Sequence, residues 1–149
     1  MKRLWPLLAG IGATGGAVLH VVLVISWRPD WYRYFEAPEW VVQSVEEGDW
    51  SGPAIGLVIA ALIQAAGLFA FSAARLIPRL PLLRAALVTL AAIGILRGLA
   101  IFPLVIAYPE LLPRLRPFDW VAAFIWGFLG VCFACAAWRE LIEKAGSKP

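Results

Sequence analysis

The stretch that decides the fold runs from Leu82 to Tyr108 and reads LLRAALVTLAAIGILRGLAIFPLVIAY. A run of this length and apolarity is long enough to cross a bilayer as a helix. One formal charge, Arg97, lies well inside it. A charge at such a depth costs roughly 2.5–3.5 kcal/mol on insertion scales, so a neighbouring group has to satisfy it. The partner of Arg97 is therefore the central question about function.

The composition of the whole chain also indicates a membrane protein. The 149 residues are 62% hydrophobic and 15% charged, whereas a soluble domain is typically about 45–50% apolar and about 25% charged. Mean hydropathy is +0.80. The net charge of +3 forms no basic stripe outside the membrane flanks, which argues against nucleic acid as a partner. The length predicts a single membrane domain, residues 1–149.

Four apolar runs predict membrane spans at about residues 4–26, 53–76, 82–107 and 120–138, with an outer loop at 27–52. Each comes close to the roughly 20 residues that a spanning helix needs. Helices are required because backbone groups in lipid must bond within their own segment. The first run exceeds the apolar core of a signal peptide, so we interpret it as an uncleaved anchor. The predicted fold is an all-α, antiparallel four-helix membrane bundle.

Basic residues near the span ends predict the orientation of the chain. Eight of them lie on the side of the two termini: Lys2, Arg3, Arg75, Arg79, Arg84, Arg139, Lys144 and Lys148. Four lie on the other side: Arg28, Arg33, Arg114 and Arg116. We therefore expect both termini in the cytoplasm.

The connections differ in character. The outer loop is acidic and aromatic, and Pro38–Glu47 within it predicts a short interfacial helix, because proline suits the first position of a helix. Prolines in Ile77–Pro81 predict a tight turn, and those in Tyr108–Pro117 predict a stiff, extended segment. Pro103 predicts a kink in the third span.

Small residues repeat four apart next to polar ones on three spans: Gly12 and Gly16 before His20, Gly56 and Ala60 before Gln64, and Gly94 and Gly98 around Arg97. Residues four apart share a helix face, and small faces let membrane helices pack closely. His20 lies roughly 10 Å below the outer end of its span, and Gln64 and Arg97 roughly 15 Å below theirs. The depths predict an outward-facing polar pocket, roofed by the acidic loop.

The core of each predicted span lacks an acidic residue, so three partners for Arg97 stay open. It pairs with a carboxylate at the rim, with Asp119 and Glu36 best placed; it reaches outer headgroups along its stem; or it holds an anionic ligand such as a lipid phosphate or a carboxylate. Trp126 lies inside the fourth span and is a candidate wall of the pocket.

Neither a catalytic residue, a metal site nor a cofactor is predicted. His20 is the single histidine and has no Ser–His–Asp arrangement around it. The sequence Cys132-Phe-Ala-Cys135 is similar to the CxxC of the vitamin K epoxide reductase family, but the loops carry no shuttle cysteines. Its depth in an apolar run predicts unreactive packing thiols.

Three segments carry a family resemblance: Arg79-Leu-Pro-Leu-Leu-Arg84, Leu96-Arg-Gly-Leu-Ala100, and Trp31-Tyr with Ala37-Pro in the outer loop. Together they resemble a group of small, functionally uncharacterised bacterial inner-membrane proteins with four spans. The resemblance implies a bacterial inner membrane and no particular activity.

The predicted function is the binding of a lipid, an amphipathic ligand or a partner subunit in the pocket of Arg97, His20 and Gln64. An oligomeric transporter or channel is one alternative, although the chain lacks the embedded carboxylate that often couples protons. A membrane enzyme acting on lipid or quinone is the other. Glycine faces pack equally well within one bundle and between copies, so a homo-oligomer stays open.

Overall fold

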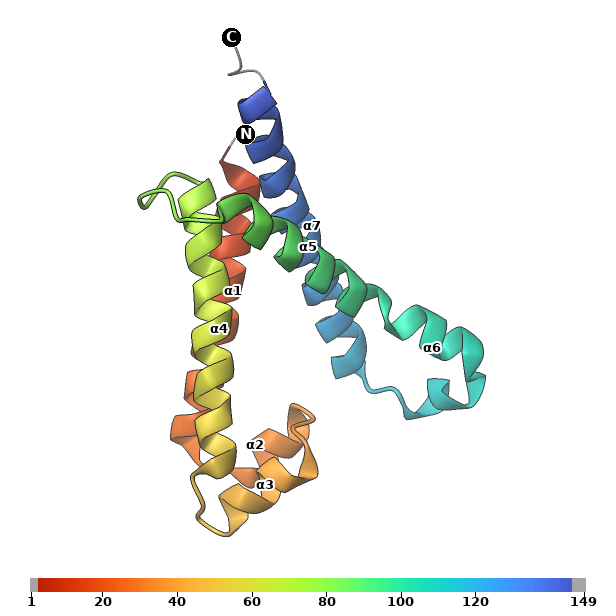
Figure 1. Ribbon diagram of the computed structural model, residues 1–149. Helices are drawn as coiled ribbons and strands as arrows, with labels where there is room; N and C mark the ends of the chain where they lie inside the picture. Colours follow the sequence, from red (N-terminus) through yellow and green to blue (C-terminus); the bar gives the residue numbers. More distant parts are fainter. Residues whose placement is uncertain (1–2, 146–149) are drawn as a thin grey trace. The chain divides into compact units, whose positions relative to one another are not determined.

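The computed structural model describes residues 3–145, so Lys2 and Lys148 of the orientation prediction lie outside the described residues (Figure 1). This part of the chain is helical and contains no strand, which confirms the all-α class. The elements are α1 (Leu4–Ser26), α2 (Pro29–Tyr34), α3 (Glu39–Glu46), α4 (Ser51–Ala73), α5 (Leu83–Leu99), α6 (Ile101–Ala107), the 3₁₀ helix η1 (Pro109–Arg114) and α7 (Pro117–Ala145).

Four helical segments are long and apolar enough to cross a membrane: α1, α4, α5 together with α6, and α7. The four predicted spans are thus confirmed as helices of spanning length. The last of them is longer than predicted at both ends, because it begins at Pro117 and continues to Ala145. This extension brings Asp119 and Glu140 into the helix.

Pro103 interrupts the third span, as the sequence predicts. The helix ends at Leu99 as α5 and resumes at Ile101 as α6. Proline has no N–H to donate to the carbonyl four residues earlier, and its ring crowds that carbonyl. The carbonyl concerned is that of Leu99, the last residue of α5. Arg97 lies three residues before Ala100, which keeps right-handed helical dihedrals (φ −59°, ψ −27°), so α5 and α6 form one span.

The chain divides into two compact units. The first unit combines the start of the chain, up to Gly12, with everything from Ala66 onward, and the second unit is Ala13–Ala65. Helices α1 and α4 each contribute residues to both units. Each unit has its own buried apolar cluster.

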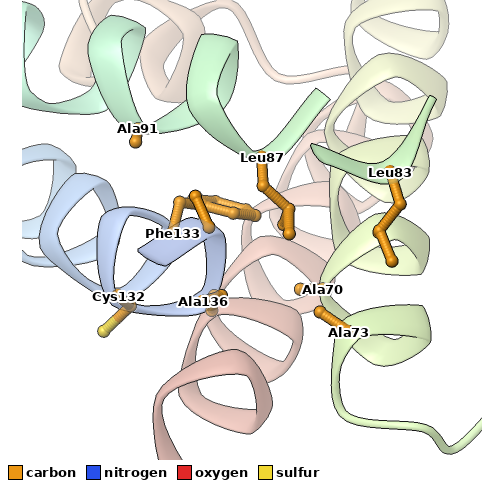
Figure 2. Close-up of a cluster of buried hydrophobic side chains, with 10 residues drawn as sticks. Ala70, Ala73, Leu83, Leu87, Ala91, Cys132, Phe133 and Ala136 are labelled. Carbon is orange, nitrogen blue, oxygen red and sulfur yellow. The ribbon is translucent and has the colours of Figure 1, made fainter. Parts of the chain in front are cut away.

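In the first unit, α5 packs along α7, and alanines from α1 and α4 complete the apolar cluster. Leu87 of α5 is 0% exposed, and Figure 2 shows its side chain beside Phe133 of α7. The buried members are Ala9, Ala70, Ala73, Leu83, Leu87, Ala91, Cys132, Phe133, Ala136 and Ala137. Small residues dominate this list, so the helices approach closely without large interlocking side chains.

Glycines set the closest approach of α5 and α7. A Cβ atom on Gly98 would lie 2.5 Å from the Cα of Gly127, and one on Gly94 would lie 2.7 Å from the Cα of Gly130. These distances are shorter than any real carbon contact, so the two backbones touch each other directly. The small face of the third span, predicted to serve packing, does so against α7.

The connection between α4 and α5 is fastened by Ser72. Its hydroxyl donates to the carbonyl of Pro78 at 3.1 Å and accepts the N–H of Leu80 at 3.0 Å. The Arg79 guanidinium extends the connection to α7, where Nη2 lies 2.8 Å from Oε2 of Glu140. The predicted tight turn is thus held by Ser72 of α4 and by Glu140 of α7.

The second unit contains the outer loop folded over the ends of α1 and α4. The predicted loop helix is confirmed as α3, with Pro38 as its N-cap and not its first residue. The sequence did not predict α2, which begins at Pro29. Tyr32 of α2 is buried with Leu23 of α1 and three valines of α3: Val41, Val42 and Val45.

Two further contacts close this loop. Arg33 of α2 forms an ion pair with Glu46 of α3, which raises the pKa of the guanidinium. A Cβ on Gly52 would lie 3.0 Å from the Val41 carbonyl, so the start of α4 needs glycine to approach α3.

The connection between α6 and α7 differs from the extended segment that the sequence predicts. It forms the 3₁₀ helix η1, which is closed by a hydrogen bond from the Leu111 N–H to the Tyr108 carbonyl.

Candidate functional site

Arg97 lies over the indole ring of Trp126. Its Cζ atom is 5.4 Å from the ring centroid, within the range of a cation–π interaction. Such a contact is worth about 2 kcal/mol or more where water is excluded. Arg97 is on α5 and Trp126 is on α7, so the interaction joins two candidate spans. Trp126, which the sequence predicts as a wall of the pocket, therefore contacts the guanidinium of Arg97.

The glycine contact explains why these two side chains meet. Arg97 precedes Gly98 and Trp126 precedes Gly127, and these two glycines touch through their backbones. With the helix axes this close, an arginine on one helix and a tryptophan on the other can meet beside the contact.

The hydrogen-bonding edge of Arg97 is available. A guanidinium has five N–H donors in its plane, whereas a cation–π interaction uses the face of the group. Within the described residues of the first unit, Arg97 makes no hydrogen bond or ion pair, and its side chain is exposed on that unit. The edge can therefore bind a carboxylate or a phosphate through two parallel hydrogen bonds.

Asp119, one of the two rim carboxylates predicted as partners of Arg97, stabilises the start of its own helix. Its Oδ2 accepts the backbone N–H of Arg116 at 2.7 Å, and a carboxylate in the first turn also suits the positive end of the dipole. Asp119 lies two turns from Trp126 along α7, roughly 10 Å. Asp119 caps α7 and Trp126 contacts Arg97, so the two residues have different roles here.

His20 and Gln64 lie at similar depths on neighbouring helices of the second unit. Contacts of Gly16 with Ile63 and of Gly56 with Val24 place α1 and α4 side by side in opposite directions. His20 shares a face with Gly16, and Gln64 lies one turn along α4 from buried Ala60. This register puts the two polar residues about one turn, roughly 6 Å, apart in depth.

The hydrogen bond of His20 determines its tautomer. Nδ1 lies 2.8 Å from the carbonyl of Gly16, and since a carbonyl only accepts, Nδ1 carries the proton. In the neutral ring Nε2 is then an acceptor. Glu36, the other predicted rim carboxylate, is exposed in the same unit at a positive φ of 57°. The three-residue pocket of Arg97, His20 and Gln64 stays a prediction, since its members belong to different units.

Sequence reasoning did not single out Glu140 or the buried phenol of Tyr32. Glu140 is 8% exposed and pairs with Arg79. Its spacing could have predicted this burial, because Glu140 follows Ala136 by four residues and Ala137 by three and so continues the buried face of α7. Tyr32 is 4% exposed, its hydroxyl has no partner among the described residues, and burial raises the pKa of its phenol.

The cysteines pack as expected. Cys132 is 0% exposed within the apolar cluster of the first unit, Cys135 is half-buried, and both are free thiols. The described residues also contain no group of three His, Cys, Asp or Glu side chains arranged to hold a metal ion.

The fold and the Arg97 site together indicate a class: an integral membrane protein with four apolar helices of spanning length. One of these spans carries a cation that rests on an aromatic ring. Comparison with models of protein families, with curated proteins and with solved structures finds no match to this chain.

Proposed function

We propose that this protein binds an anionic group inside the membrane, at the exposed edge of Arg97, and that it acts as a binding protein and not as an enzyme. The group belongs to a lipid, another amphipathic ligand or a partner subunit. In this proposal the four spans form an antiparallel bundle in a bacterial inner membrane, with both termini in the cytoplasm.

The observation that carries the proposal is the surroundings of Arg97 and its contact with Trp126. It lies in the apolar run from Leu90 to Ala107, where it is the single charged residue, and its guanidinium contacts the ring of Trp126. The cation–π contact offsets part of the free energy of burying the charge, but a guanidinium in lipid also needs acceptors for its N–H groups. An anion at its edge supplies both acceptors and the opposite charge.

Binding is favoured over catalysis by the condition of the reactive side chains. The Nδ1 atom of His20 is already bound to its own helix, and Cys132 is fully buried. An arginine remains protonated under all ordinary conditions, so it positions and stabilises an anion and does not transfer protons.

Native mass spectrometry of the gently solubilised protein tests this proposal. The wild type is compared with Arg97→Leu, Arg97→Lys and the control Arg114→Leu, which removes an exposed arginine from η1. We expect a bound species in the wild type and the control, its loss in Arg97→Leu, and weaker retention in Arg97→Lys, because a lysine cannot form the two parallel bonds. Identical spectra for the wild type and Arg97→Leu contradict the proposal.

A further inference from the structure

We infer that the anion at Arg97 is a carboxylate carried by the membrane-spanning helix of a different protein chain. This inference rests on the proposed function and names its partner. Four features of the structure support it: the depth of Arg97, the direction of its side chain, the absence of acids in the cores of its own spans, and the apolar face around it.

Depth argues against a lipid headgroup. Arg97 lies roughly 15 Å along the helix from Ala107 and roughly 21 Å from Leu83, the two ends of its span. Headgroup phosphates lie outside the hydrocarbon core, which is about 30 Å thick. An arginine near a span end can reach them, but Arg97 is close to the middle.

The direction of the side chain adds to this distance. In an α-helix each Cα–Cβ bond is tilted toward the N-terminus, so Arg97 starts toward Leu83, the more distant end of the span. The contact with Trp126 then holds the guanidinium at a fixed level. Trp126 itself lies roughly 14 Å along α7 from Pro117. The guanidinium of Arg97 therefore lies deep whether its depth is measured along α5 or along α7.

The central parts of this chain's own spans offer no carboxylate to a second copy. The acidic residues of α7 with described side chains are Asp119 and Glu140, near its two ends, and both already have partners. The other three spans contain no acid. Two copies that met through this face would bring one Arg97 against another, and like charges in low dielectric repel strongly. The partner is therefore a chain of different sequence.

The surface around Arg97 suits a helix. Ile93 lies one turn before it on the same face and is 49% exposed on the first unit, and neighbouring Leu96 is 69% exposed there. Ala100, at the break between α5 and α6, is a small exposed residue one turn further on. A spanning helix with a central Asp or Glu would cover these apolar side chains while its carboxylate met the guanidinium edge.

The probe for this inference is a synthetic spanning peptide of leucine and alanine with lysines at both ends and one glutamate at its centre. A matched peptide carries glutamine instead. Each labelled peptide is titrated against the full-length labelled protein in phosphatidylcholine vesicles, and association is measured by energy transfer. We expect the glutamate peptide to bind the wild type about tenfold more tightly than the glutamine peptide, as a charge-assisted pair should.

The variants assign this preference to Arg97. It should vanish in Arg97→Gln, decrease in Arg97→Lys, and persist in Arg114→Gln. Equal binding of both peptides to the wild type overturns the inference. If mass spectrometry still shows a lipid that Arg97→Leu loses, the occupant is that lipid and the proposed function stands. If neither experiment depends on Arg97, the proposed function fails as well.

Discussion

Two pairs of helices in this protein approach each other in different ways. Between α5 and α7, glycines of both helices meet, so that a Cβ on Gly98 would lie 2.5 Å from backbone atoms of Gly127. Between α1 and α4 in the second unit, Gly16 and Gly56 each face the tip of a side chain. A Cβ on Gly16 would lie 3.5 Å from Ile63, and one on Gly56 would lie 2.9 Å from Val24.

The difference shows how the spacing of two helices decides which side chains can meet. Side chains separate α1 from α4, whereas backbone contact between α5 and α7 leaves room beside the contact for a long cation and a large ring to meet. Arg97 and Trp126 occupy that room. The spacing of glycines in one span therefore does not predict how closely that span packs until the helix packed against it is known.

The cations of the two units show a parallel contrast. Arg33 pairs with Glu46 where both side chains are nearly half exposed, and such surface pairs contribute about 0–1 kcal/mol. Arg97 instead combines an aromatic partner with an exposed edge in an apolar span. The first arrangement closes a loop, and the second leaves capacity for a ligand.

The largest effect is expected from Gly98→Ala. The added methyl group meets the backbone of Gly127 at 2.5 Å, so the helices must separate, at a cost of about 1–3 kcal/mol. Gly127→Ala is the matched control, because its Cβ would find only the Cα of Gly98 at 3.8 Å. Unfolding by a denaturing detergent, followed by circular dichroism, measures both. Equal losses in the two variants would show that the contact is not built as described.

Trp126→Leu should lower the free energy of unfolding by about 1–2 kcal/mol, since it removes the ring beneath Arg97. A double-mutant cycle with Arg97→Met isolates the interaction. We expect Trp126→Leu to cost clearly less in the Arg97→Met background than in the wild type. An unchanged cost in that background would mean that the ring contributes through packing alone.

In the second unit, Tyr32→Phe should stabilise the protein by about 1 kcal/mol, because it removes a buried hydroxyl without a partner. Burial raises the pKa of Tyr32, so the unfolded state loses this proton first as the pH rises. The stability that this group contributes is complete below about pH 10, the ordinary tyrosine value, and is lost as the pH rises through the folded pKa. Alkaline unfolding titrations of both proteins should show that Tyr32→Phe lacks this loss.

The smallest effect is expected from Gly16→Ala, whose methyl group makes an ordinary contact with Ile63 at 3.5 Å. The change in free energy of unfolding should stay within about 0.5 kcal/mol, since alanine also favours the helix. Gly15→Ala serves as the reference, because its Cβ meets nothing within 4 Å. A loss at Gly16 as large as that at Gly98 would remove the contrast between the two helix pairs.

Hydropathy and proline positions predicted the four spans, the α3 helix and the break at Pro103, because these depend on local sequence. They did not predict that Gly94 and Gly98 of α5 meet Gly130 and Gly127 of α7, which depends on the register of two distant segments. Gly127 and Gly130 lie three apart, a spacing that a search for residues four apart passes over.

The sequence singled out Arg97 by its depth and lone charge, and Trp126 as a candidate wall of a pocket. The structure brings these two residues into contact, and the pocket itself stays a prediction. That Trp126 is the contact of Arg97, while Asp119 caps its own helix, follows from the register of α5 against α7. Glu140 was missed because its charge suggested that the span had ended, although its spacing continued the buried face.

Solid-state NMR of the protein in lipid bilayers tests the central claim most directly. With ¹³C at Cζ of Arg97 and in the ring of Trp126, we predict a dipolar contact that corresponds to the 5.4 Å between the guanidinium and the ring centroid. The same contact should disappear in Trp126→Leu. A guanidinium without a tryptophan contact, in contact instead with the carboxylate carbon of Asp119 or Glu36, would contradict the account.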